Sequence, residues 1–155
     1  MTAAGFTLQA IATVSSPRTE VTDDRWGAVD ATVTLCPPLE ADALVGLDAF
    51  SHVEVVYLFD RVAATEVTLG VRRPRGNPAW PEVGILAQRG KDRPNRLGVT
   101  VCALVAVTGA SLTVRGLDAV DGTPVLDIKP YLAEFGPRGA VRQPLWSHEL
   151  MTDYF

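Results

Sequence analysis

Two neighbouring stretches decide the fold and the candidate site: Gly84-Ile-Leu-Ala-Gln-Arg-Gly-Lys-Asp-Arg-Pro-Asn-Arg-Leu-Gly98 and Asp118-Ala-Val-Asp-Gly-Thr-Pro-Val-Leu-Asp-Ile-Lys-Pro-Tyr131. Both mix Gly, Pro, Asn, Asp and Arg with apolar runs, which is typical of loops that wrap a polar ligand. A β-branched run at residues 99–107 and a shorter one at 111–115 lie between them. We interpret these runs as two strands that carry the polar stretches at their ends.

The rest of the chain consists of short apolar runs separated by Gly and Pro. Alternating or strongly apolar patterns predict four further strands, at residues 6–14, 28–35, 53–59 and 67–73. A short helix that ends at Gly46 is expected over 39–46, an irregular loop over 74–81, and a second short helix within 144–155. This pattern predicts a mainly β fold, a barrel or sandwich with few short helices, which forms a compact single domain over residues 1–155.

Composition weighs against a protein that grips nucleic acid over a wide surface. The 155 residues are 47% hydrophobic, with a net charge of −4 and a pI of about 5.1, whereas such proteins are usually basic. The charge is uneven, because residues 72–96 contain seven Lys or Arg against two acidic residues. This basic island could face phosphate, a carboxylate or only water, and a solvated surface is the default for a charge cluster.

The sequence offers no sign of a metal site or a membrane segment. Cys36 and Cys102 lack metal-ligand spacing and sit among apolar residues, which predicts reduced thiols in or near the core. His52 and His148 are far apart, and there is no HExxH motif and no glycine-rich phosphate loop. The N-terminal residues lack a charged region followed by a long apolar run, so we expect no signal peptide, no membrane span and a cytoplasmic location.

Three aspartates cluster within the second polar stretch. Asp121 begins an Asp-Gly-Thr-Pro sequence that is good turn chemistry by itself, so Asp121 needs no ligand to explain it. Asp127 lies between apolar residues and should be paired, with Lys129 or an arginine as the partner. Structural and functional roles for this stretch carry about equal weight.

Other candidates stand at the ends of predicted strands. The three arginines of residues 88–96 present planar donor forks that suit carboxylates or phosphates, although a solvated hairpin tip explains them too. Trp26 lies in a polar loop, where it either covers the core or stacks on a ligand. His52 precedes an apolar strand, and such a histidine is more often a hydrogen-bonded structural residue than a base.

Three stretches stand in this order along the chain: Gly46-Leu-Asp-Ala-Phe-Ser-His52, Arg93-Pro-Asn-Arg-Leu-Gly98 and residues 118–131. They follow one another as they do in the TsaA-like family, which the chain resembles over nearly its whole length. That family includes bacterial and archaeal enzymes that N6-methylate threonylcarbamoyladenosine beside the tRNA anticodon. The resemblance implies a compact β-barrel that binds S-adenosyl-L-methionine without a Rossmann domain. It also implies a homodimer with sites near the subunit interface.

The resemblance implies site residues by matching motifs. Cofactor contacts are expected from four segments. The arginine loop supplies Arg89 and Val99, and a strand end supplies Asp60 and Arg61. An acidic turn supplies Asp118, Asp121, Gly122, Thr123 and Pro124, and an N-terminal loop supplies Asp24, Arg25 and Trp26. Substrate phosphate is expected at Lys91, Arg93, Asn95 and Arg96. An amide-like N6 nucleophile must lose a proton, and the candidates for that base are Tyr131, Asp127 and His52.

Three departures from the family pattern bear on the substrate. Ala87-Gln-Arg-Gly90 replaces the Ala-Thr-Arg-Ser of the tRNA enzymes, Arg96 replaces the second proline of their Arg-Pro-Asn-Pro-Ile-Gly core, and Asp60 stands where histidine is common. We expect an S-adenosylmethionine-dependent methyltransferase with threonylcarbamoylated tRNA as the leading substrate. The alternatives are a methyltransferase of a small molecule or protein, and a cofactor-binding regulatory module without turnover.

Overall fold

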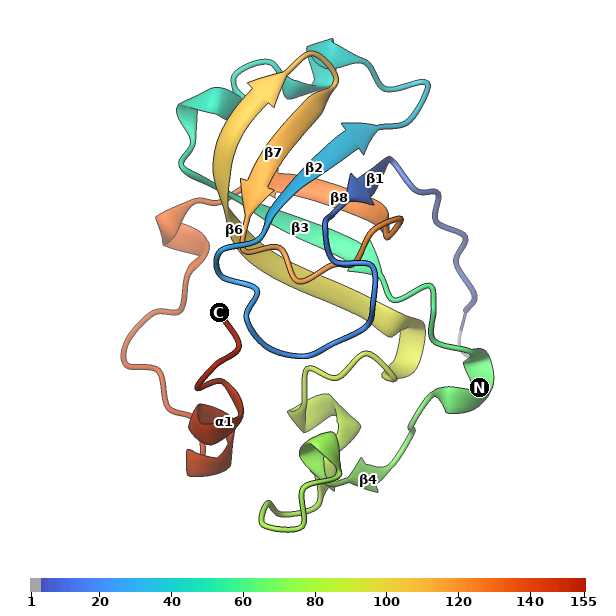
Figure 1. Cartoon of the computed structure of the whole chain (residues 1–155), viewed down its shortest axis with the longest axis vertical. Coiled ribbons are helices and arrows are strands. Elements are labelled where there is room, and N and C mark those ends of the chain that lie inside the picture. The colour runs from blue at the N-terminus through green and yellow to red at the C-terminus, as the bar shows by residue number, and fades with distance from the viewer. Residues whose placement is uncertain (1–3) are drawn as a thin grey trace.

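A closed barrel of six antiparallel strands forms the centre of the computed structural model, which describes residues 4–155 (Figure 1). Around the barrel the order is β1-β2-β7-β6-β3-β8. The strands are β1 (Ala12–Ser15), β2 (Asp30–Leu35), β3 (His52–Leu58), β6 (Leu97–Thr108), β7 (Ser111–Arg115) and β8 (Pro124–Pro130). The predicted mainly β barrel is therefore confirmed. Residues 1–3, part of the stretch in which we expect no signal peptide, lie outside the described residues.

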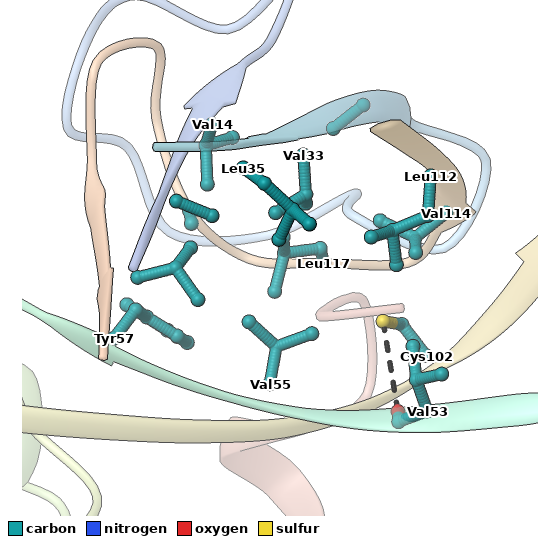
Figure 2. Packing of buried hydrophobic residues seen from close by; sticks show 14 of the residues in the cluster. Val14, Val33, Leu35, Val53, Val55, Tyr57, Cys102, Leu112, Val114 and Leu117 are labelled. Carbon is teal, nitrogen blue, oxygen red and sulfur yellow. Dashed lines mark hydrogen bonds between the residues drawn. The ribbon is translucent and has the colours of Figure 1, made fainter. Parts of the chain in front are cut away.

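Strict alternation of side chains fills the barrel. In β3, Val53, Val55 and Tyr57 are buried while the residues between them face outward. Val33 of β2 and Leu112 of β7 meet them from the opposite wall, as Figure 2 shows. Successive side chains of a strand point to opposite faces, so each strand contributes every second residue to one core. Burial of these apolar side chains is the main term that favours the barrel.

Two predicted strands are much shorter than their patterns suggest. The expected strand 6–14 is only β1, and the preceding residues are exposed, with 88% of Phe6 accessible. The expected strand 67–73 is reduced to β4 (Val71–Arg72), which pairs with β5 (Val83–Gly84). A strand requires a hydrogen-bonding neighbour, and pairing with the barrel begins only at Ile11, whose amide donates to the Val125 carbonyl at 2.8 Å.

Helical structure is confined to short pieces. The predicted helix over 39–46 is instead two 3₁₀ turns, η1 (Ala41–Leu44) and η2 (Leu47–Ala49), separated by Gly46 at a φ of 85°. The helix expected near the end of the chain is α1 (Leu145–Leu150). The remaining 3₁₀ turns are η3 (Ala64–Glu66), η4 (Pro74–Gly76), η5 (Ile85–Ala87), η6 (Pro94–Arg96) and η7 (Ala133–Phe135). Within residues 4–155, no helix has the length and apolar character needed to cross a membrane.

The loops that carry the candidate site gather on one side of the barrel. Figure 1 shows the blue loop between β1 and β2 lying between the barrel and two lower segments, the green β4 region and the red C-terminal segment with α1. Backbone hydrogen bonds confirm that this loop meets the C-terminal segment, because the Arg25 amide donates to the Asp153 carbonyl at 2.7 Å. Residues far apart in the sequence thus meet on this side of the barrel, which we call the rim.

The two cysteines differ sharply in accessibility, and we expect them to differ in reactivity. Cys102 is buried in the core, with its sulfur 3.8 Å from the Val53 carbonyl oxygen (Figure 2), whereas Cys36 is half-buried. Burial, with a smaller contribution from Asp118, raises the pKa of Cys102 to about 12, so the thiolate is scarce at neutral pH. An Ellman titration of native protein should therefore label Cys36 alone, and denaturant should release Cys102. Fast labelling of Cys102 in native protein would contradict this burial.

Candidate functional site

The acidic turn at residues 118–124 is tied to the segment that follows β1. The Gly122 amide donates to the Val14 carbonyl at 2.8 Å, and the Asp121 amide donates to the Arg18 carbonyl at 2.8 Å. In return the Ser16 amide donates to the Asp121 carboxylate at 3.0 Å. The turn chemistry expected of Asp-Gly-Thr-Pro is present, with Gly122 at a φ of 82°. Backbone contacts therefore fix the turn against the rim.

Arg61 joins a second predicted segment to the same rim. Its guanidinium donates to the Thr19 carbonyl at 2.5 Å and to the Asp121 carbonyl at 2.8 Å. Asp60, beside it, is exposed and lies two residues beyond the end of β3. The strand end and the acidic turn, which the sequence separates by about 60 residues, are thus brought together.

Asp118 is the centre of a hydroxyl cluster. Tyr57 donates to its Oδ1 at 2.9 Å, Thr100 also donates to Oδ1, and Tyr154 donates to Oδ2. Burial first, and the nearby Asp118 second, raise the pKa of both tyrosines above its ordinary value, so both remain protonated donors at neutral pH. The Asp118 side chain is therefore held by the protein itself.

The N-terminal loop is positioned by its own polar contacts. Asp24 forms an ion pair with Arg75 at 2.7 Å, and Asp24 and Arg25 have φ values of 29° and 63°, unusual for residues with a Cβ. Trp26 is 3% exposed and lies under the Arg18 guanidinium, 4.1 Å from its centre. Of the two roles considered for Trp26, burial favours packing, while contact with a cofactor stays a prediction.

Arg89 and Val99 meet on the outer face of the barrel wall. An Arg89 guanidinium nitrogen donates to the Val99 carbonyl at 2.5 Å. Val99 is 36% exposed, whereas the next residue, Thr100, is 6% exposed and faces Asp118. The backbone contact of Arg89 and the side-chain contact of Asp118 are thus made with adjacent residues of β6, Val99 and Thr100.

All three arginines of the arginine loop donate to backbone carbonyls, Arg89 as just described. Arg93 donates to the Gln88 carbonyl at 2.7 Å, and Arg96 donates to the Val62 carbonyl. Asn95 and Arg96 adopt φ values of 62° and 53°, which asparagine tolerates better than most residues. Lys91 and Arg89 are exposed, so these two cations are the most available to a ligand.

The candidate bases lie away from the acidic turn. Because β3 and β8 are antiparallel, His52 and Tyr131 share one end, where the Tyr131 amide donates to the His52 carbonyl at 3.0 Å. Asp60 and the turn stand at the other end, roughly 20 Å away along seven strand residues. Asp127 lies between them, opposite Val56, and forms the expected pair with Lys129.

Sequence reasoning missed the partners of Asp118 and the role of Arg18. Tyr57, Thr100 and Tyr154 come from three separate segments, and the one signal available was that a tyrosine within an apolar strand needs a partner for its hydroxyl, a signal that was not used. Arg18 holds the N-terminal loop through the Asp24 and Arg25 carbonyls, each at 3.2 Å. No spacing in the sequence signals these long-range contacts.

An apolar cavity of about 380 Å³ lies elsewhere, and its lining contains none of the predicted site residues. Its walls include Leu44, Leu47, Phe50, Ile128 and Pro130. Residues with convergent polar groups identify a site better than volume does, so we place the candidate site at the rim of the acidic turn. Across residues 4–155, no three His, Cys, Asp or Glu side chains gather as metal ligands would.

The fold defines the class: a mainly β domain built on a closed barrel of six antiparallel strands. The chain belongs to the family described as the tRNA-methyltransferase O N-terminal domain, which matches residues 15–136. The resemblance inferred from the motifs is thus confirmed.

Named relatives give the family its context. The human tRNA (adenine(37)-N6)-methyltransferase is 37% identical over 111 residues, which cover 72% of this chain and 25% of that protein. A probable S-adenosyl-L-methionine-binding protein of Pyrococcus abyssi is 35% identical over 116 residues, 74% of this chain and 59% of that one. The crystal structure of TrmO from Pseudomonas aeruginosa superimposes with a TM-score of 0.73 at 28% identity, covering 92% of this chain and 63% of that one. The chain spans only part of each relative.

Proposed function

We propose that this chain binds S-adenosylmethionine and transfers its methyl group, with the N6 atom of threonylcarbamoyladenosine beside the tRNA anticodon as the leading acceptor. The observation that carries the proposal is the rim itself, where Arg61 joins the strand end to the acidic turn in a chain of this family. The relatives support it, because one is named for the tRNA reaction and another for the cofactor.

The residues present fit the polar groups of such a cofactor. Arg89 is an exposed guanidinium fork, suited to the cofactor's carboxylate, and Asp60 is an exposed carboxylate, suited to its ammonium or ribose hydroxyls. The carbonyls of Val99 and Asp121 already accept from arginine, which shows that both point toward polar partners. We propose Arg89 and Arg61 as the principal holding residues, with the acidic turn as the wall between them.

Methyl transfer requires little from the protein beyond positioning and proton removal. When bound, the cofactor supplies a methyl group on a sulfonium sulfur for in-line displacement. The chain's task is to hold the acceptor in line and exclude water, which carries much of the rate enhancement. For the proton, Tyr131, His52 and Asp127 remain the proposed bases. Asp127 is already paired with Lys129, and this makes His52 and Tyr131 the stronger pair.

A homodimer would explain the distance between these bases and the acidic turn. His52 and Tyr131 stand at the far end of β3 from Asp60, so one chain does not offer both to the same ligand. We propose that a second copy brings them together. Exposed valines on the outer face of β6, Val99 at 36% and Val101 at 42%, support an apolar contact there. Sedimentation analysis of wild type and Val101→Asp tests this arrangement.

The transfer assay compares acceptors directly. Radiolabelled S-adenosylmethionine is incubated with the protein and tRNA, either carrying threonylcarbamoyladenosine or lacking that modification. We expect label in the modified tRNA alone, and binding that weakens steeply as salt rises, because Lys91, the exposed cation among the predicted substrate residues, would contact phosphate. Label in a small molecule or protein, with none in tRNA, would replace the proposed acceptor.

A regulatory module that binds the cofactor without turnover is the second candidate. It is favoured by the Pyrococcus abyssi relative, which is named only for binding, and by Asp60 at a position where the tRNA enzymes commonly have histidine. Saturable cofactor binding without any S-adenosylhomocysteine production, across tRNA and small-molecule pools, would establish this candidate and exclude the transferase.

A further inference from the structure

The C-terminal segment, residues 145–155, lies along the N-terminal loop at the rim (Figure 1). The Arg25 amide donates to the Asp153 carbonyl at 2.7 Å, and the Trp26 amide donates to the Tyr154 carbonyl at 2.8 Å. Backbone hydrogen bonds from two consecutive residues fix the segment against the loop. These residues also lie beyond residue 136, where the family match ends, so the match itself does not account for them.

The contact is close enough to require a glycine. A Cβ added to Gly27 would lie 2.6 Å from the backbone carbonyl carbon of Phe155, and real Cβ atoms do not approach backbone so closely. A side-chain bond extends the contact to the neighbouring loop, because the Trp80 indole donates to the Glu149 carboxylate at 2.7 Å. The segment is thus packed against two loops of the rim.

Tyr154 reaches from this segment to the acidic turn. Its hydroxyl donates to Oδ2 of Asp118, the oxygen that Tyr57 and Thr100 leave free. The Tyr154 backbone carbonyl meanwhile accepts from Trp26. One residue therefore connects the N-terminal loop with the acidic turn, the two segments that the resemblance assigns to the cofactor.

Both segments need outside support to keep their shape. Asp24 and Arg25 hold left-handed φ values of 29° and 63°, which costs free energy in residues with a Cβ and persists only when neighbouring contacts impose it. The backbone bonds to Asp153 and Tyr154 are such contacts. A loop that is already ordered loses less entropy when a ligand binds, so fixing it raises affinity.

We propose that the C-terminal segment clamps the cofactor site, with Tyr154 as a positioning residue that holds Asp118 and the N-terminal loop in their binding geometry. This inference rests on the proposed binding of S-adenosylmethionine. It gives residues outside the matched part of the family a role in cofactor binding. It predicts that substitutions in the segment weaken binding although the segment does not touch the ligand.

Calorimetry with S-adenosylmethionine tests the clamp through two variants of the full chain. Tyr154→Phe removes only the hydroxyl, and Gly27→Ala drives the Phe155 backbone away, while Gly70→Ala is the matched control because its added Cβ meets nothing within 4 Å. We expect the dissociation constant to rise about five- to tenfold in each variant, an effect the size of one ordinary hydrogen bond because the segment acts on the ligand only indirectly, and to stay unchanged in the control. Amide hydrogen exchange of the ligand-free variants should quicken at residues 24–27 and 118–122.

The outcomes separate the clamp from the function on which it rests. Wild-type protein that binds no S-adenosylmethionine would overturn the proposed function and the clamp together. Wild-type binding with unchanged affinity and unchanged exchange in both variants would overturn the clamp alone. Tighter binding in the variants would also overturn it, because the segment would then compete with the cofactor. A loss of thermal stability with neither local exchange nor affinity altered would reduce Tyr154 to a packing residue.

Discussion

Asp118→Ala lowers the free energy of unfolding by about 3 kcal/mol, an effect that we expect from the loss of a carboxylate that accepts from three hydroxyls. Tyr57 is 2% exposed and Thr100 6% exposed, so water replaces the lost acceptor poorly at both donors. Urea unfolding followed by circular dichroism measures the change, with the slope checked for two-state behaviour.

Asp30→Ala is the matched control for this prediction. Asp30 also pairs its carboxylate with a donor, accepting from Arg115 at 2.6 Å and 2.9 Å, but both side chains are exposed to solvent. An exposed ion pair contributes little to stability, so the urea midpoint of this variant should stay close to that of the wild type. Equal effects of the two substitutions would show that the Asp118 cluster is no stronger than a surface contact.

Arg89→Ala weakens S-adenosylmethionine binding by about 10- to 100-fold if its guanidinium holds the cofactor's carboxylate, as a lost charge-assisted hydrogen bond of ordinary strength predicts. Arg89 is exposed, and its one hydrogen bond to the protein among the described residues is to the Val99 carbonyl, so the variant should fold normally. Calorimetry gives the dissociation constant, and Arg142→Ala, which removes another exposed arginine far along the chain, should leave it unchanged. Wild-type affinity in Arg89→Ala would remove Arg89 from the site.

The barrel could be predicted from the sequence because its signal is local. Strongly apolar or β-branched runs over residues 53–59 and 99–107 predicted strands, and those runs became β3 and much of β6. The same kind of pattern over residues 6–14 failed for its first half, because pairing depends on a neighbour that local pattern does not reveal.

The arrangement of the predicted site residues could be foreseen only in part. Motif matching named Arg61 and Asp121, and the structure joins them directly, but it could not show that His52 and Tyr131 lie at the opposite end of β3. The hydroxyls around Asp118 come from segments up to about 60 residues away, so their meeting is a product of the tertiary fold. Pairing of Asp127 with Lys129 was foreseeable, because it involves neighbours on one face of a single strand.

The most direct test of the account is calorimetry of the purified wild-type protein with S-adenosylmethionine, repeated with S-adenosylhomocysteine. The account predicts saturable binding of both ligands, with equal numbers of ligand molecules and chains at saturation. Absence of binding to either ligand, in a sample whose circular dichroism shows the folded barrel, would contradict it. The family fold would then be present without its cofactor chemistry.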